Sequence, residues 1–514
     1  MYGTFTIAVA ALLLFVRLVL YPLAVYVVDS KGLRSYPNMS LLSGVTDWPF
    51  MIEATRGFRS LHLAKLHKTK PVIRIGPNSL SYGDARAIKD IYGHSSKCIK
   101  DDFYSLVSGS HFHLADVIDK AEHQRKRKVL SSAYAIKNLE GWEYKVADKI
   151  VRLVQQLDKR SAPSDATPTD ANVVDWRAWS NFFTMDAITD IGLSAPLGFL
   201  DQGNDITVSE SISGVTSNVS YRDCLHGQLR AISVLVWSYG WYQSFCKWSR
   251  RFSTNYGKLL GKGDGFDGIV VHQARQRLKR YQSGEKLEDF FQALMESKDG
   301  MANHLPFGEI VAEISIMLNA GSVSTAIAIN NSMFLLLKNP DKLLKLRQEI
   351  DGVADQDEIS ISYDKIKDLP YLRACLDESM RILPPTSFGL PRKTPAEGCE
   401  IFGQWVPGNT TVSMSAYVAH RDEFIFPDPE TFRPERWLGE EGKKLQPYFI
   451  TFSAGARGCI GRNISYLEQV IIIASTIHRY DLELDSPTFD QTRYEHFNLV
   501  PGPLPLKIRR RSQE

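Results

Sequence analysis

Paired cysteines are missing from this 514-residue chain, which has only six cysteines in all. They are spread along the sequence without the short repeated spacing of a zinc motif or a disulfide framework: Cys98, Cys224, Cys246, Cys375, Cys399 and Cys459. A reducing compartment is therefore the simpler interpretation. The chain also lacks internal repeats and a strong excess of one charge. Its formal net charge of +3 is too small to indicate nucleic acid as a partner.

The most apolar stretch lies near the N-terminus, from Phe5 to Val28, and is interrupted by Arg17 and Pro22. Because about 20 apolar residues suffice to cross a bilayer, we expect a membrane anchor over residues 1–28. A cleaved signal peptide is the alternative, but the charged n-region is missing and the apolar stretch is long for a signal sequence. Arg17, near mid-span, either snorkels to the interface or marks a tilted or re-entrant segment.

The rest of the chain has the composition of a globular protein with a sizeable core, at 44% hydrophobic and 23% charged residues. Residues 29–49 form a polar, proline-bearing hinge, and residues 50–514 form one large domain. Helical periodicity predicts helices over residues 84–92, 119–134, 307–338 and 371–383. Alternating patterns predict a hairpin over residues 71–82 and a strand over residues 411–417. The expected fold is mainly α with a smaller β-rich part.

One cysteine lies in a glycine-punctuated loop, Phe452-Ser-Ala-Gly-Ala-Arg-Gly-Cys-Ile-Gly461. We expect Gly455 and Gly458 to adopt positive φ, and Gly461 to leave room for a flat cofactor. The apolar periodicity that follows predicts a helix with Cys459 at its start, where unpaired N–H groups lower the pKa of a thiol. Taken alone, such a cysteine is more often a small buried hydrophobic residue.

The whole pattern, Phe-x-x-Gly-x-Arg-x-Cys-x-Gly, closely resembles the haem-binding signature of the cytochrome P450 superfamily. The resemblance implies that Cys459 is the axial thiolate ligand of a haem b iron. It also implies that Arg457 pairs with a haem propionate and that Phe452 packs under the ring beside the sulfur.

Further landmarks of the family concern the haem propionates. His123 and Arg127, four residues apart on the helix expected over residues 119–134, resemble an aromatic-x-x-x-Arg pair that holds propionates. Histidine here replaces the commoner tryptophan and keeps a hydrogen-bond donor. Arg392 matches another propionate-binding arginine, and Thr386 to Leu390 would line the substrate cavity.

Behind the haem, the resemblance implies a buried network of Glu378, Arg381 and Arg436, the last from Phe432-Arg-Pro-Glu-Arg-Trp437. The plainer alternative is a modest exposed pair, because Glu378 and Arg381 are three residues apart on one helix face.

The long helix expected over residues 307–338 carries Asn319-Ala-Gly-Ser-Val-Ser-Thr325 at its centre. It resembles the family's Ala-Gly-x-acid-Thr motif, with Ser324 in place of the usual threonine and Val323 in place of the acid. Since oxygen activation consumes protons, we expect Ser324 or Thr325 to relay them with water. Val323 is either a tolerated variation in an ordinary monooxygenase, or a sign that the substrate supplies the proton path. A third possibility is an enzyme that rearranges or dehydrates its substrate.

Two surface features leave alternatives open. Arg125, Lys126, Lys128 and Arg462 form either a solvated face or an outward-facing site for an acidic electron donor. The aromatic residues between Leu225 and Tyr256 belong either to the core or to a membrane interface.

The resemblance covers essentially the whole chain after the anchor. It is closest to fungal benzoate 4-monooxygenase-type and secondary-metabolism members, on residues 121–128, 371–378 and 459–468. It implies a haem-thiolate catalytic domain over residues 50–514 that inserts one oxygen atom from dioxygen into an apolar or aromatic small molecule. Electrons would come from NADPH through NADPH-cytochrome P450 reductase. A single N-terminal span would hold the protein in the endoplasmic reticulum membrane with its catalytic domain cytosolic.

Two other functions remain alternatives at this point. One is a haem-thiolate isomerase or dehydratase that needs no NADPH. The other is a non-catalytic haem- or lipid-binding membrane protein.

Overall fold

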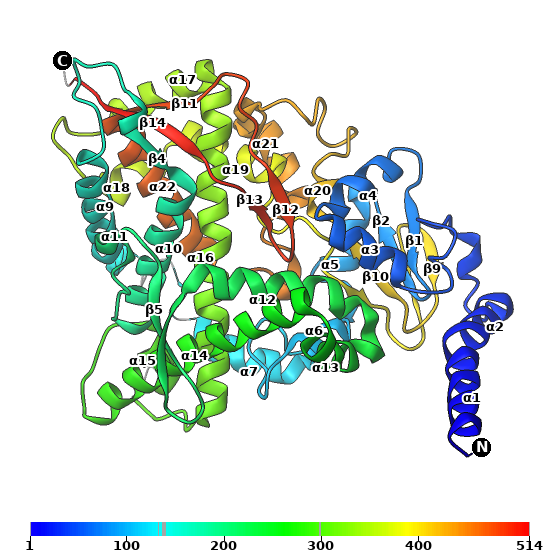
Figure 1. Cartoon of the computed structure of the whole chain (residues 1–514). Helices are drawn as coiled ribbons and strands as arrows, with labels where there is room; N and C mark the ends of the chain where they lie inside the picture. Colours follow the sequence, from blue (N-terminus) through cyan, green and yellow to red (C-terminus); the bar gives the residue numbers. More distant parts are fainter. Residues whose placement is uncertain (1, 132, 136–139, 298–299, 513–514) are drawn as a thin grey trace.

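A computed structural model of the chain describes residues 2–131, 133–135, 140–297 and 300–512 (Figure 1). The expected anchor begins at residue 1 and the expected catalytic domain ends at residue 514, and both of these ends lie outside the described residues. The same holds for residue 132, near the end of the helix expected over residues 119–134.

The N-terminal segment is one continuous helical rod made of α1 (Tyr2–Phe15), a π-helical turn (Val16–Leu20) and α2 (Tyr21–Val28). It stands apart from the body of the protein in Figure 1. Within it, Phe5–Val28 has a mean hydropathy of 2.4 and none of its most apolar window is buried. It is therefore long and apolar enough to cross a membrane. Helix α16 (Phe307–Lys338) also passes this test, but 61% of its most apolar window is buried, as in a core helix.

Most of the body is helical, and α16 runs through its centre (Figure 1). The other body helices are α3 (Trp48–Arg56), α4 (Arg59–His67), α5 (Ile88–Tyr92), α6 (Phe103–Val107), α7 (Lys120–Ser131), α9 (Glu143–Asp158), α10 (Trp176–Leu193), α11 (Phe199–Gln202), α12 (Tyr221–Leu235), α13 (Tyr242–Phe252), α14 (Thr254–Gln282), α15 (Phe290–Met295), α17 (Pro340–Asp351), α18 (Tyr363–Ile366), α19 (Pro370–Ile382), α20 (Ala416–Ala419), α21 (Gly439–Leu445) and α22 (Arg462–Arg479). The helices predicted over residues 307–338 and 371–383 are confirmed within one residue at each end.

The largest sheet lies beside the anchor in Figure 1 and has the strand order β1-β2-β10-β7-β3. Its strands are β1 (Val72–Gly76), β2 (Ser79–Tyr82), β10 (Thr411–Met414), β7 (Arg392–Lys393) and β3 (Ile99–Lys100). The predicted hairpin is confirmed, because β1 and β2 pair antiparallel. Strands β3 and β7 pair antiparallel with Lys100 opposite Arg392, which brings two cations from distant parts of the chain together.

The remaining strands are short. β11 (Tyr480–Leu484), β14 (Pro505–Arg510) and β4 (Val173–Asp175) form a three-stranded sheet. The two-stranded pairs are β12 (Arg493–Glu495) with β13 (Leu499–Pro501), β5 (Ile206–Glu210) with β6 (Thr216–Ser220), and β8 (Cys399–Ile401) with β9 (Gln404–Val406). The expected mainly α fold with a smaller β-rich part is therefore confirmed.

The aromatic residues between Leu225 and Tyr256 divide between the two alternatives. Trp237 is 5% exposed and belongs to the core, whereas Phe252 is 79% exposed. The rings of Trp241, Phe245 and Trp248 follow one another along one side of α13, with centroids 6.5 and 5.8 Å apart. One face of this segment therefore packs inward and the other presents aromatic rings to the surroundings.

Candidate functional site

The loop before α22 is shaped by one glycine in particular. Gly455 has a φ of +66°, and a Cβ there would lie 2.3 Å from the carbonyl oxygen of Tyr92, so only glycine fits. The Cys459 N–H donates to the carbonyl of Phe452 at 2.8 Å and closes the loop. The expectation for Gly458 was wrong: its φ is −57° because it follows a short 3₁₀ turn as ordinary extended backbone.

The sulfur of Cys459 lies just before α22, which begins three residues later at Arg462. The Cys459 side chain is accessible, yet protein surrounds it at longer range, so burial raises the pKa of its thiol. The backbone N–H groups of Gly461 and Arg462 and the charge of Arg127 oppose that rise, since each favours the thiolate. An accessible sulfur with donors behind it is suited to ligate a metal as a thiolate.

Phe452 lies at the start of the same loop and is half-buried. Its ring centroid is 5.2 Å from that of Tyr466 on α22, and the guanidinium of Arg462 lies 5.6 Å from it. The aromatic side chain is thus held beside the cysteine loop by the helix that follows.

Four residues predicted to hold propionates, one of them His123, lie in one group with a fifth residue, Lys100. The charges of Arg457, Lys100, Arg127 and Arg392 all act on the imidazole of His123, which is 6% exposed. Burial first, and then these four charges, lower the pKa of His123 to about 4, so the ring is neutral at pH 7. Burial and the charges of Arg392 and Arg457 also hold the pKa of Lys100 well below its usual range.

Among the described residues, none of these four cations forms an ion pair with a carboxylate, although the charges of Asp116 and Asp119 act on Lys100 and Arg457. Arg392 is 4% exposed and its Nη1 has no hydrogen-bond partner among the described residues. Arg457 donates to the backbone carbonyls of Val117 and Ile118 at 2.7 and 2.8 Å, and Arg127 donates to that of Gly458 at 2.9 Å. Crowded, partly buried cations with an unpartnered donor fit a cofactor that carries carboxylates. We call Lys100, His123, Arg127, Arg392 and Arg457 the cationic cradle.

The centre of α16 lies close to the start of α22. Thr325 is 2% exposed, and its hydroxyl donates to Ser465 Oγ on α22 at 3.0 Å. Ser465 comes six residues after Cys459, so this contact places the Ser324–Thr325 turn near the cysteine. Ala320 is exposed and Ser324 is half-buried, and the two lie on one face of an otherwise buried helix. The Ser324 hydroxyl donates to the Ala320 carbonyl at 2.8 Å.

Comparison with known proteins agrees with this geometry. The family model for cytochrome P450 matches residues 62–509. The chain belongs to the cytochrome P450 family. Among curated relatives, benzoate 4-monooxygenase bphA of Aspergillus niger is 30% identical over 505 residues, covering 96% of each chain. Cytochrome P450 monooxygenase atr2 of Stereocaulon alpinum is 30% identical over 88% of this chain and 85% of the relative.

The fold comparison shows that the chain has the fold of a cytochrome P450. The crystal structure of a cytochrome P450 superimposes with a TM-score of 0.72 over 93% of this chain and 99% of that chain, at 19% sequence identity. As a P450, the chain is a haem-iron oxidoreductase with monooxygenase function, supplied with electrons from NADPH through a redox partner. The fit of the cationic cradle to the two carboxylates of haem agrees with that assignment.

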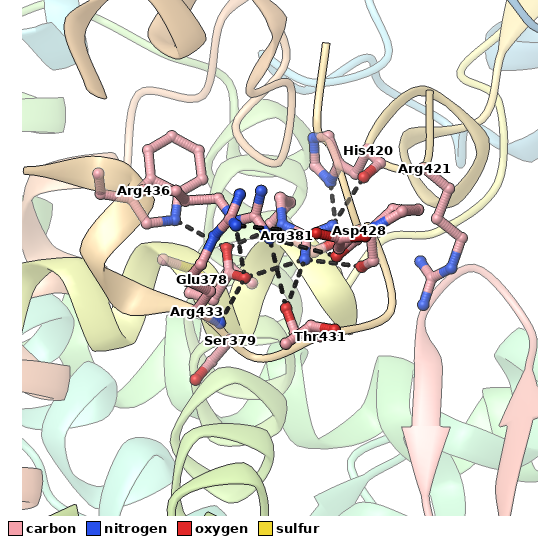
Figure 2. A network of polar contacts seen from close by, with 12 residues as sticks. Glu378, Ser379, Arg381, His420, Arg421, Asp428, Thr431, Arg433 and Arg436 are labelled. Carbon is pink, nitrogen blue, oxygen red and sulfur yellow. Dashed lines mark hydrogen bonds and ion pairs between the residues drawn. The ribbon is translucent and has the colours of Figure 1, made fainter. Parts of the chain in front are cut away.

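In this P450, Glu378 is the centre of a buried polar network (Figure 2). Arg381 donates to its two carboxylate oxygens at 2.8 and 2.9 Å, and Arg436 Nε donates at 3.0 Å. Trp437 Nε1 and the backbone N–H of Arg433 add donors at 2.9 and 3.0 Å. Glu378 and Arg381 are fully buried, which excludes the alternative of an exposed surface ion pair.

The arginines of this network also hold the chain that leads to the cysteine loop. Arg381 donates to the carbonyls of His420 and Pro429 at 2.8 and 2.7 Å, and Arg436 donates to that of Pro427 at 3.0 Å. His420 then accepts the N–H of Ile450 on its Nε2 at 3.0 Å. A single set of contacts therefore connects Glu378 to the segment that enters Phe452 and Cys459.

The expectation that Lys126 faces outward was wrong. Its side chain is 4% exposed and its Nζ lies 2.6 Å from Glu309 and 3.0 Å from Glu313, both on α16. Lys126 therefore joins α7 to α16. Arg125 and Lys128 are exposed, and Arg125 forms ion pairs with Glu122 and Glu309.

Sequence reasoning missed Lys100 as a member of the cradle. Nothing in its immediate sequence marks it, because its role depends on the pairing of β3 with β7, whose strands lie almost 300 positions apart. The sequence prediction also missed Trp437 as a hydrogen-bond donor to Glu378, although Trp437 directly follows the predicted network residue Arg436. A buried tryptophan normally needs a partner for its N–H, which is a signal that could have found it.

Proposed function

We propose that this P450 inserts one oxygen atom from dioxygen into an apolar or aromatic small molecule of fungal secondary metabolism. The carrying observation is an accessible Cys459 in a loop that the cationic cradle contacts. Arg127 donates to the carbonyl of Gly458, next to the cysteine, and Nη1 of Arg392 has no partner among the described residues. Relatives named benzoate 4-monooxygenase and cytochrome P450 monooxygenase support an oxygenation of this kind. Benzoate is one candidate substrate among aromatic acids, polyketides and terpenoids.

When bound, haem b supplies the oxygen chemistry through its iron. Cys459 would hold the iron through its thiolate, and Phe452 would pack beside the sulfur. Arg127, Arg392 and Arg457 would pair with the propionates as charged donors. His123, neutral at pH 7, would donate one N–H to them, and Lys100 would add charge.

Ser324 is the better placed of the two proposed proton-relay residues. Its half-buried hydroxyl lies on the accessible face of α16, next to Ala320. Thr325 directs its hydroxyl to Ser465 in the core, so we assign it the positioning of α16 against α22. Val323 offers no carboxyl group, so Ser324 and water would carry protons without the acid that other family members use.

The redox partner is proposed to be NADPH-cytochrome P450 reductase. Exposed Lys128 and Arg462 supply positive charge that favours an acidic partner, whereas exposed Arg125 is already paired with Glu122 and Glu309. Lys126 takes no part in such a surface because it is buried against α16.

The membrane arrangement is proposed to be a single N-terminal span in the endoplasmic reticulum, with the catalytic domain in the cytosol. Arg17 lies 5.9 Å from the ring of Trp241 and 5.1 Å from that of Tyr21, so the rod and the exposed aromatic face of α13 belong to one region. Aromatic rings with Arg250 and Arg251 beside them suit the headgroup layer. We expect Trp248→Ala and Phe252→Ala together to weaken binding of an anchor-deleted protein to vesicles.

The test of oxygenation uses full-length protein, reductase and NADPH with a panel of aromatic acids, polyketides and terpenoids under labelled dioxygen. Label in a product would support oxygen insertion and identify the substrate class. Product formed without NADPH would instead favour an isomerase or dehydratase. Haem binding with no turnover of any compound would favour a non-catalytic haem- or lipid-binding protein.

A further inference from the structure

The pattern that distinguishes the cationic cradle occurs a second time, where α10, α12 and the β12–β13 turn meet. Arg177, at the start of α10, is 4% exposed, and its Nη1 has no hydrogen-bond partner among the described residues. Burial, and then the charge of Arg222, lower the pKa of Arg177 to about 9, and the charge of Asp175 opposes this shift. Buried arginines are normally paired with an anion, but Arg177 forms no ion pair with a carboxylate among the described residues.

One face of α12 supplies further cationic and polar groups. Arg222, His226 and Arg230 follow one another at intervals of four residues and therefore share that face. Arg222 lies 5.4 Å from the ring of Phe182 on α10, and Arg230 lies 4.9 Å from the ring of Tyr494 on β12. The face is thus held between α10 on one side and β12 on the other.

Two histidines complete the group. Nδ1 of His226 and Nδ1 of His496, in the β12–β13 turn, are both buried without a partner among the described residues. Burial and the charges of Arg177 and Arg222 lower the pKa of His226 to about 3, with His496 acting in the same direction. Burial and the charges of Arg230 and Arg59 lower the pKa of His496 to about 3. Both rings are therefore neutral at pH 7.

The acidic groups nearby are already engaged. Asp205 lies 3.5 Å from Arg222 and accepts the Arg222 N–H at 2.7 Å. Asp175 accepts the backbone N–H groups of Arg177 and Leu504 at 3.1 and 2.9 Å. Arg59 is matched by Glu495 at 2.8 Å. Among the residues that the structure describes, Nη1 of Arg177 and Nδ1 of the two imidazoles remain without a hydrogen-bond partner.

We propose that Arg177, His226 and His496 form a binding site for a small organic carboxylate, separate from the cationic cradle. The planar fork of an arginine takes both oxygens of a carboxylate, and the two imidazoles add N–H donors. The site requires no haem and no oxygen chemistry, so it stands apart from the proposed function.

The site lies next to residues that line a cavity beside the segment leading to Cys459. His496 is followed by Phe497, whose ring is 5.7 Å from that of Phe388. Asn498 donates to the Thr386 hydroxyl at 3.3 Å, and Thr386 and Phe388 line a cavity shared with the segment before Cys459. The carboxylate is therefore either the acidic end of a larger organic ligand that extends along the turn, or a free small anion.

Thermal unfolding and calorimetric titration of the full-length, haem-loaded protein test the proposal, with benzoate, benzamide and inorganic phosphate as probes. Benzamide keeps the ring of benzoate and removes its charge. The variant is Arg177→Met. The matched control is Arg277→Met, which removes an arginine that is 1% exposed and, unlike Arg177, forms a two-bond ion pair with Asp289, through Nε at 2.8 Å and Nη2 at 3.1 Å.

We expect benzoate to bind and raise the unfolding temperature, and benzamide to bind at least about tenfold more weakly, since it forms no ion pair. Arg177→Met should weaken benzoate binding by at least about tenfold while leaving anion-free stability unchanged or higher. Arg277→Met should lower stability and keep the benzoate response. Proton uptake on binding, seen as a buffer-dependent heat, would show that the bound anion raises the pKa of His226 or His496.

Stabilisation by both benzoate and phosphate would indicate a site filled by a free anion, and stabilisation by benzoate alone would indicate the acidic end of an organic ligand. The proposal is overturned if Arg177→Met keeps wild-type benzoate affinity, if benzamide binds as tightly as benzoate, or if Arg177→Met is as destabilising as Arg277→Met. Labelled-dioxygen turnover is measured separately, so a failure there leaves this result standing.

Discussion

Replacement of Glu378 by glutamine is the most direct test of how the core behind the haem is held together. The change keeps the shape of the side chain but removes its charge and turns one acceptor oxygen into a donor. The carboxylate of Glu378 receives five donors, two from Arg381 and one each from Arg436, Trp437 and the Arg433 backbone. In the variant, Arg381 and Arg436, which are 0% and 7% exposed, lose the only carboxylate that pairs with them among the described residues.

The expected loss is roughly 3 to 5 kcal/mol of unfolding free energy, the usual effect of leaving a buried charge unmatched. Urea unfolding of the haem-loaded protein, followed by tryptophan fluorescence and by the haem absorbance, measures it. Because Arg381 and Arg436 also hold the chain that leads to Cys459, haem should be released at a lower urea concentration than in the wild type.

Glu440→Gln provides the control. Glu440 lies four residues after Arg436, but its side chain is 80% exposed and its ion pair with Lys443 is 2.6 Å long. A surface pair of this kind contributes about 0 to 1 kcal/mol. If Glu378→Gln costs no more stability than Glu440→Gln, the buried network does not hold the fold as proposed.

Three further predictions concern single residues. Cys459→Ala should abolish the thiolate-type Soret band of the reduced carbon-monoxide complex while leaving the circular dichroism of the fold unchanged; retention of the band would exclude Cys459 as the ligand. Ser324→Ala should lower the product formed per NADPH several-fold, whereas Thr325→Val should leave this ratio unchanged and cost about 1 kcal/mol of stability for the lost bond to Ser465. The opposite pattern would assign the relay to Thr325. Burial and the charge of Arg381 lower the pKa of His420 to about 3, against about 6.5 in the unfolded chain, so stability is full above pH 6.5 and falls as the pH drops from 6.5 towards 3. The urea midpoint of His420→Gln should depend less steeply on pH over that range, and an equal slope would contradict the assignment.

The features that could be predicted from the sequence are those set by local pattern. Apolar periodicity located α16 and α19 almost to the residue, and the turn Gly76-Pro77-Asn78 located the β1–β2 hairpin. The helix after Cys459 was predicted as well. It was expected to begin at Cys459 but begins at Arg462, so the sulfur lies just before the N–H groups of its first turn.

The features that escaped prediction depend on contacts between distant segments. Lys126 was expected to face solvent because it lies in a basic run, but two glutamates on α16 draw it inward. A charge run does not show which member has partners elsewhere in the chain. Lys100 joined the cradle only through the register of β3 against β7. Gly458 was expected at positive φ because glycine tolerates it, but the loop takes positive φ at Ser453 and Gly455 instead, and Gly458 is extended.

Position 323 shows how burial changes the interpretation of a missing acid. Val323 is 1% exposed and packs in the main hydrophobic core, while its neighbours Ala320 and Ser324 lie on the accessible face of α16. A carboxyl group introduced by Val323→Asp would be desolvated, which raises its pKa and lowers the stability of the folded protein.

We therefore expect Val323→Asp to lose stability and not to increase the product formed per NADPH, as measured by paired product and NADPH assays with urea unfolding. Val323→Asn controls for polarity at the same position without an ionisable group. A variant that gains product per NADPH, while Val323→Asn does not, would mean that the carboxyl reaches the relay at Ser324. That result would show that the absence of an acid at position 323 limits proton delivery. The burial of Val323 in the core indicates instead that proton delivery does not depend on a carboxyl group at this position.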